Sequence, residues 1–332
     1  MSKPQSPLAF RDYRLFWIAR FCAVLAQVGM VVVIGWQVYD VARTDYGMVP
    51  KAAAFQLGLI GIAQFLPLLV LMPVAGWMAD RFDRRYVASA ALSLDLLNAL
   101  ALGWMTAHDS LTLPALFIVA GLHGVVRAFN GPSLSSIAPN LVPPESLPRA
   151  IAMSSIAWQT GGILGPAFGG LAYAAHPASS YWIAAALLAI TTASILSIRP
   201  YARTSIKDGS HPLRQMIDGL GYVRGHRFLL GAITLDLFAV LLAGATALLP
   251  VYARDILKIG PEGLGWLRGA PALGATIMAL WFSFRPLANN VGIKMLAAVI
   301  AFGVATIVFG ISTNLWLSLA MLTILGAADM LS

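Results

Sequence analysis

Charged side chains lie inside several long apolar stretches of this sequence, and their types and positions allow specific chemistry. They are Asp95, Arg127, Asp236, Arg20 and Arg268. A charge at the centre of a hydrocarbon layer costs about 2.5–3.5 kcal/mol on insertion scales, so such groups are usually paired, face water or serve a function. Asp236 is the leading candidate for a group that binds a proton or another cation. A structural ion pair is the alternative interpretation.

For the other embedded charges we expect either a structural ion pair or binding of an anionic group. Asp95 and Arg127 lie at similar estimated depths, and we expect them to form a structural ion pair. Arg20 and Arg268 are candidates to bind an anionic group of a substrate, although Arg20 is shallow enough to extend toward the membrane surface instead. The polar and aromatic residues that could line a cavity near these charges are Gln27, Asn130, Trp158 and Gln159.

Other kinds of chemistry have little support in the sequence. Cys22 is the only cysteine, and the histidines are scattered, so no metal-ligand spacing is present. The sequence also lacks a glycine-rich nucleotide loop and a nucleophile–base pattern. We therefore expect no metal, no cofactor and no enzymatic activity.

The elements that must position these residues are membrane-spanning helices. Of the 332 residues, 59% are apolar and only 11% are charged, against about 25% charged in ordinary soluble domains. Apolar blocks of about 20 residues, long enough to cross a bilayer as helices, recur along the chain. The fold class predicted is therefore all-α, with about ten spans near residues 16–40, 55–79, 87–107, 112–137, 150–174, 180–198, 228–251, 264–284, 291–312 and 315–332.

The positive charges predict how these spans are oriented. With a cytoplasmic N-terminus, the inside segments hold most of the lysines and arginines, and the outside loops hold only Arg43, Lys51, Arg254 and Lys258. This is the positive-inside pattern of a multi-pass protein in a plasma membrane or bacterial inner membrane. The net charge of +8 is then a topology signal with anionic lipid headgroups as counter-charge, and nucleic acid is not an expected partner.

The chain divides near its middle. Residues 1–198 hold six predicted spans, residues 199–227 form a polar linker on the cytoplasmic side, and residues 228–332 hold about four further spans. Part of the linker has the spacing of an amphipathic surface helix. Transporters built from two six-helix halves have this layout, so the second half is expected to be an incomplete copy.

A basic motif follows the second predicted span. Gly76, Asp80 and Arg81, followed by Arg84 and Arg85, resemble the cytoplasmic signature of the major facilitator superfamily. Gly76 would let two helices approach, and the acidic and basic residues would control gating. Asp83 stands where the family usually has glycine. An ordinary positive-inside loop is the alternative interpretation.

The fifth predicted span carries a glycine series. Gly161, Gly165 and Gly169 fall on one helix face, and Pro166 favours a bend. The series resembles the antiporter-associated motif of the same superfamily, in which this helix meets the eighth. The eighth span here has a small-residue face of its own, made of Gly265, Gly269, Pro271 and Gly274. A helix-packing face without a mechanistic role is the alternative.

Four longer segments resemble the enterobactin-exporter-like branch of the superfamily. They are residues 10–17, 138–145, 221–224 and 249–254. This resemblance implies a secondary transporter, expected to be a monomer, that exports a siderophore or drug-like molecule by alternating access and proton antiport. Family members continue for two more spans, so we expect a fragment or a natural truncation. A truncated, non-transporting membrane protein, or a partner of an intact carrier, is the alternative.

Overall fold

The computed structural model describes residues 6–200, 221–226, 229–231, 233, 234, 237, 244–284 and 291–330, apart from the side chains of residues 80, 244, 245, 283, 284 and 291. All regular structure in these ranges is helical. The first half contains α1 (Arg11–Thr44), α2 (Pro50–Arg81), α3 (Arg84–Ala107), α4 (Leu113–Ile137), α5 (Leu147–Ala175) and α6 (Ser179–Leu196). The later part contains α10 (Pro261–Phe284), α11 (Val291–Ile311) and α12 (Leu315–Asp329).

Short helical segments connect these long helices. They are η1 (Pro7–Ala9), η2 (Ala138–Asn140), η3 (Pro144–Ser146), η4 (Gly244–Leu248), α9 (Leu249–Val251) and the π-helical η5 (Tyr252–Ile256). Nine predicted spans coincide with long helices, with ends that differ by a few residues. The predicted span 228–251 and the predicted linker helix lie largely outside the described residues.

The exposed surface of the bundle is apolar, as lipid contact requires. Within the described ranges, α1, α2, α3, α4, α6 and α11 are long and apolar enough to cross a membrane, and α12 is a shorter apolar helix. Only 11% of the most apolar stretch of α2 is buried, and its exposed side chains include Phe65, Leu69 and Val70. An apolar face of this size would be unfavourable in water and suits hydrocarbon.

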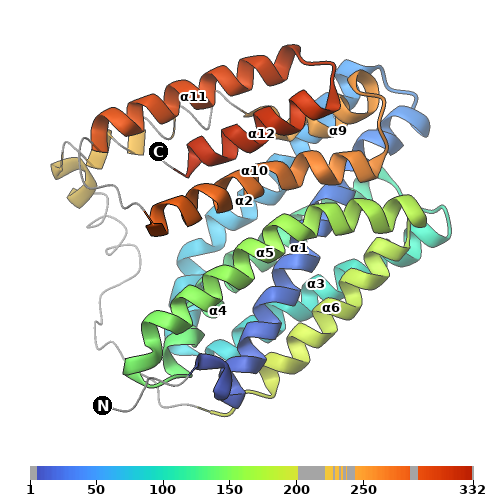
Figure 1. The fold of residues 1–332 in the computed structure, drawn as a ribbon. Coiled ribbons are helices and arrows are strands. Elements are labelled where there is room, and N and C mark those ends of the chain that lie inside the picture. The colour runs from blue at the N-terminus through green and yellow to red at the C-terminus, as the bar shows by residue number, and fades with distance from the viewer. Residues whose placement is uncertain are drawn as a thin grey trace.

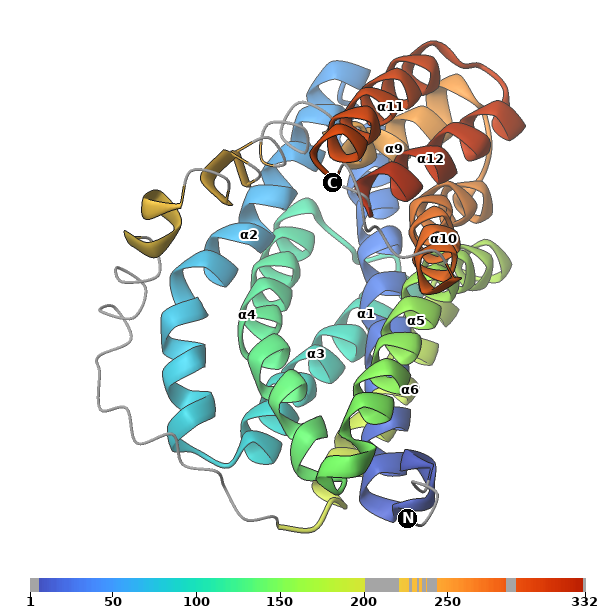
Figure 2. The same cartoon turned by 60° about the vertical axis from the view of Figure 1, so that its left-hand side comes forward.

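The helices form two groups that meet along α5 and α10 (Figures 1 and 2). In the first group α1 packs against α5 and α6, α3 against α4 and α6, and α2 along α4. In the second group α12 packs against α10 and α11. The core of the first group includes the fully buried Tyr13, Phe16, Leu92, Leu116 and Leu188.

One end of the bundle collects arginines, and we call it the basic end. It comprises the start of α1, the α2–α3 turn, the α4–α5 connection and the end of α6. Tyr13 donates to the Ala150 carbonyl at 2.6 Å, joining α1 to α5. Arg84 donates to the Ser136 carbonyl at 3.1 Å, and Arg85 donates to the Ile198 carbonyl. The opposite end, where α1 ends and α2 begins, is the distal end.

Candidate substrate cavity and gate

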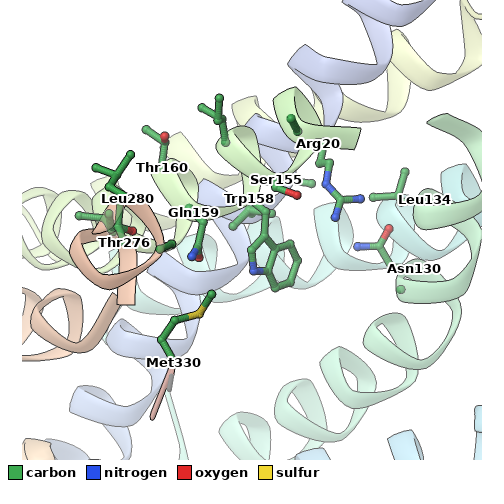
Figure 3. Close-up of a pocket in the computed structure, with 17 residues that line it drawn as sticks. Arg20, Asn130, Leu134, Ser155, Trp158, Gln159, Thr160, Thr276, Leu280 and Met330 are labelled. Atoms are coloured by element: carbon green, nitrogen blue, oxygen red, sulfur yellow. The ribbon is translucent and has the colours of Figure 1, made fainter. Parts of the chain in front are cut away.

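A cavity of about 990 Å³ lies between the two groups of helices, nearer the basic end. Its walls come from α1, α4 and α5 on one side and from α10 and the end of α12 on the other, so both groups contribute (Figure 3). Most of the lining is apolar. The polar residues of the lining are Arg20, Asn130, Ser155, Gln159, Thr160 and Thr276.

Among the described residues of this lining, the one charged side chain is Arg20, which lies beside the indole of Trp158. The Arg20 guanidinium carbon is 5.6 Å from the centroid of the Trp158 ring. The Arg20 Nε atom is buried and has no hydrogen-bond partner among the described residues. Asn130 lies near the same guanidinium, and Gln159 and Thr276 lie farther along the cavity (Figure 3). A cation and an aromatic face in an apolar wall suit an amphipathic molecule with an anionic or electron-rich group.

Some of the residues predicted to bind substrate or line a cavity do line this one, and others do not. Arg20, Asn130, Trp158 and Gln159 do line it, so the side chain of Arg20 faces this cavity. The predicted residues that do not line it are Gln27, Asp95, Arg127 and Arg268. Asp236, the leading candidate for ion binding, lies outside the described residues.

The predicted ion pair between Asp95 and Arg127 is wrong. Asp95 is fully buried and its Oδ1 lies 2.8 Å from Nδ1 of His123, which is also buried. Its other oxygen, Oδ2, accepts a 2.8 Å hydrogen bond from Gln27. Arg127 is exposed on α4. Arg127 and His123 are four residues apart and therefore share a helix face, and the rotation of α4 places the imidazole against the carboxyl.

At the distal end, polar side chains of α1 bind η5 and close the space between the two groups. Arg254 forms an ion pair with Asp40, and the Tyr39 hydroxyl donates to Asp255. The Arg254 guanidinium also lies 5.9 Å from the centroid of the Tyr39 ring. We call Tyr39, Asp40, Arg254 and Asp255 the distal gate.

Apolar residues reinforce this closure. Val32 of α1 is buried in a cluster with residues of α9, η5 and α10, which are Leu249, Tyr252, Ala253, Leu264, Leu267 and Ala270. A Cβ on Gly35 would lie 3.6 Å from the Pro250 ring. The two groups are therefore in close contact at the distal end, while the cavity separates them nearer the basic end.

The basic motif is held at the α2–α3 turn. Asp83 caps α3 by accepting a 3.0 Å hydrogen bond from the Arg85 amide, and its carboxylate lies 2.6 Å from the Arg85 guanidinium. Arg84 donates to the Ala79 carbonyl at 3.1 Å, and the Arg81 guanidinium lies 5.4 Å from the centroid of the Trp77 ring. Asp83 thus stabilises the start of α3 at the position where the family usually has glycine. The side chain of Asp80 is outside the described part of the chain.

Gly76 shows no close helix approach to the part of the chain that the structure describes. Among those residues, nothing would lie within 4 Å of a Cβ on Gly76. Close approaches occur instead at α5.

The glycine series of α5 packs against α1. A Cβ on Gly169 would lie 2.8 Å from the Gly29 carbonyl oxygen, and one on Gly161 would lie 2.9 Å from the Val24 side chain. Gly165 similarly faces the Leu25 carbonyl oxygen at 3.0 Å. The face predicted from the spacing of four is confirmed as a close-packing face, but α1 rather than α10 occupies it.

The expected contact between α5 and α10 is confirmed, through other residues of α5. A Cβ on Gly265 would lie 2.5 Å from the Pro166 carbonyl oxygen, and one on Gly269 would lie 3.1 Å from the Ile163 carbonyl oxygen. Gly274 faces Thr323 of α12 instead.

Two sets of residues were missed in the sequence. His123 was counted only among scattered histidines, although its place in the middle of an apolar span was a signal that could have found it. The distal gate was also missed. The sequence does contain a signal for this gate, because it places possible partners at the ends of two apolar spans. Tyr39 and Asp40 end one span, and Arg254 and Asp255 follow another.

The comparisons with known proteins agree with this architecture. The family described as transmembrane secretion effector matches residues 2–332. The enterobactin exporter EntS of Escherichia coli O1:K1 is 26% identical over 319 residues, covering 95% of this chain and 73% of that protein. The EntS protein of Shigella boydii serotype 18 is 25% identical over 317 residues, with the same coverage.

Solved structures share the fold at lower identity. A bacterial homologue of the human lysosomal transporter Spinster, in an inward-facing and unoccupied conformation, has a TM-score of 0.69 and 17% identity. That match covers 97% of this chain and 73% of the other. The human organic anion transporter MFSD10 has a TM-score of 0.66 and 17% identity, covering 97% and 83%.

Proposed function

The chain belongs to the transmembrane secretion effector family of major facilitator transporters, and from that premise we propose that it exports a small molecule by alternating access coupled to proton antiport. Its relatives are transporters rather than enzymes. The observation that carries the proposal is the cavity between the two groups of helices, which the distal gate closes from one end.

The geometry supports alternating access. Transporters of this architecture expose one central site to each side in turn as the two halves rock against each other. Here the distal end is closed and the cavity lies toward the basic end. The positive-inside rule assigns the basic end to the cytoplasm, which makes this the inward-facing conformation with a cytoplasmic N-terminus. Opening the distal gate and closing the basic end would release substrate outside.

The proposed unit is a monomer with the domain boundaries expected from the sequence. Residues 1–198 form the first half, residues 199–227 the linker, and residues 228–332 belong to the second half. Packing of α5 on α10 through Gly265 and Pro166 supports a pivot between the halves, because close backbone contact lets helices tilt without large side chains intervening.

The cavity indicates the class of substrate. In the described part of the lining, Arg20 supplies the one positive charge and Trp158 an aromatic face, while the opposite wall is mostly apolar. A catechol siderophore or an anionic, aromatic drug-like molecule fits this chemistry. The names of the EntS relatives make enterobactin the first candidate.

Enterobactin efflux from bacterial cells that lack their own exporter tests this proposal. We expect efflux that a proton uncoupler stops. Arg20→Gln should weaken it about 5- to 30-fold, because losing a desolvated cation at an aromatic face removes about 1–2 kcal/mol. Arg20→Lys should retain part of the activity.

The matched control is Arg127→Gln, which removes an exposed arginine outside the cavity and should leave efflux unchanged. Loss of efflux in the control, or full efflux in Arg20→Gln at equal membrane abundance, would contradict the assignment of the cavity. The absence of any efflux by a well-inserted wild-type protein would favour the non-transporting alternative.

A further inference from the structure

A carboxyl–imidazole pair lies in the middle of the first half, away from the cavity lining. Asp95 is 0% and His123 is 1% exposed, and their Oδ1 and Nδ1 atoms are 2.8 Å apart. Asp95 lies eleven residues beyond the start of α3, and His123 lies ten residues beyond the start of α4, which begins at the other end of the bundle. At about 1.5 Å per residue, both lie about 15 Å from their end, near the centre of a hydrocarbon core about 30 Å thick.

Amide side chains connect this pair to the cavity. Gln27 of α1 donates to Asp95 Oδ2 at 2.8 Å, and Asn130 of α4 donates to Gln27 Oε1 at 3.3 Å. Asn130 lines the cavity, and its Oδ1 is buried with no partner among the described residues. A continuous chain of side chains thus runs from the cavity wall to a buried acid and a buried base.

No lysine or arginine in the described part of the chain forms an ion pair with Asp95. Apart from Asp95, residues 86–107 of α3 are uncharged, as are residues 52–79 of α2 and all of α6. The other charge on α4 is the exposed Arg127, and the charge of α1 nearest to Gln27 is Arg20, two helical turns away. A lone buried carboxylate costs several kcal/mol, and a proton on His123 would convert it into a hydrogen-bonded ion pair of zero net charge.

We propose that Asp95 and His123 form the proton-binding site of this transporter, an inference that rests on the proposed function. Without the extra proton, the carboxylate and neutral imidazole carry a net charge of −1. One proton from the outside solution binds the imidazole and gives a net charge of zero. The same proton leaves to the cytoplasm after the conformational change, so one proton enters for each substrate exported.

Helix α1 supplies the physical link between the three parts of the mechanism. It carries Gln27 at the proton site, Arg20 in the cavity and Tyr39 and Asp40 in the distal gate. A substrate that contacts Asn130 would change the hydrogen bond to Gln27 and hence the donor on Asp95. Because α1 is one continuous helix, a shift at Gln27 also reaches the gate.

The test is enterobactin transport by the reconstituted full chain in two modes. The first mode is accumulation driven by an imposed pH gradient, and the second is exchange of labelled for unlabelled enterobactin without a gradient. Asp95→Asn keeps the side-chain shape but removes the negative charge that would stabilise the proton on His123. We expect it to lose gradient-driven accumulation at least tenfold while keeping exchange within about threefold of wild type. His123→Gln should behave in the same way, and the exposed His108→Gln should match wild type.

Full gradient-driven accumulation by Asp95→Asn would overturn the proposal. The proposal would also be overturned if Asp236→Asn lost gradient-driven accumulation while Asp95→Asn and His123→Gln kept it. A purely structural role would instead reduce both modes together. If wild-type protein shows no exchange of enterobactin, the proposed function fails, and a titration then decides the proton site by itself.

That titration uses a protein in which His123 is the one remaining histidine, with ¹⁵N-labelled imidazole. Three of the replaced histidines, His108, His176 and His226, are exposed, so their replacement leaves the pair intact. We expect the ¹⁵N signals of the His123 ring to show a bound proton in one conformation of the pair and to change when Asp95→Asn is added. A ring whose signals are the same with and without Asp95→Asn would overturn the proposal.

Discussion

Loosening the distal gate should shift the protein toward the outward-open conformation. The double variant Tyr39→Phe and Asp40→Asn removes the hydrogen bond to Asp255 and the charge that pairs with Arg254, while keeping the size of both side chains. Both contacts join α1 to η5. They exist only while the distal end is closed, so their loss raises the energy of the closed state alone.

The size of this shift depends on how exposed the side chains of the distal gate are, because exposure weakens their interactions. Arg254 and Asp40 are 28% and 36% exposed, so their ion pair is worth about 0.5–1 kcal/mol, near the upper range for surface pairs. The hydrogen bond from buried Tyr39 to the exposed Asp255 is worth about 1–2 kcal/mol. The total of about 1.5–3 kcal/mol predicts a rise of about 10- to 150-fold in the ratio of open to closed states.

Spin-label distances across the distal end measure this ratio. Labels replace the exposed residues Tyr46 and Ile256 in a Cys22→Ala background, since Cys22 is the sole cysteine. We expect a new, longer distance in the double variant. The matched control, Asp12→Asn, breaks the Arg11–Asp12 pair at the basic end and should leave the distribution unchanged. An unaltered distribution in the double variant would refute the gate.

Two further predictions concern packing and capping in the first half, and both are read from the thermal unfolding of purified protein. Gly169→Val should destabilise the protein by about 1–3 kcal/mol through overpacking against Gly29. Gly162→Val, on the same helix but with free space around its Cβ, should have little effect, and equal losses in the two variants would contradict the packing account. Asp83→Ala should lower the stability by about 1 kcal/mol through loss of the α3 cap. Asp83→Asn should retain the cap while losing the ion pair to Arg85, so a loss as large as that of Asp83→Ala would contradict the capping role.

The sequence predicted the helices well because hydrocarbon imposes both their length and their composition. Nine of the expected spans are long helices in the structure. Their ends were less predictable. The first span was expected at residues 16–40, whereas α1 runs from Arg11 to Thr44, because buried residues such as Tyr13, Val41 and Ala42 extend its packing at both ends.

Side-chain partners were predicted less well because depth and spacing leave the rotation of each helix undetermined. Asp95 could reach either His123 or Arg127, which occupy the same face of α4 one turn apart, and the structure selects the histidine. Likewise, the spacing of Gly161, Gly165 and Gly169 identifies a packing face but not the helix that fills it. Asn130, Trp158 and Gln159, which were expected to line a cavity, do so, whereas Gln27 of the same expected set contacts Asp95 instead.

The central claim, export through this cavity by opening and closing of the distal gate, is tested most directly by locking that gate. Cysteines replacing Asp40 and Arg254, in the Cys22→Ala background, are joined by a short, reducible thiol cross-linker in protein reconstituted with enterobactin. We predict that the cross-link stops enterobactin transport and that reduction restores it, while either single cysteine has no such effect. Transport that continues at the same rate in the fully cross-linked protein would contradict the account.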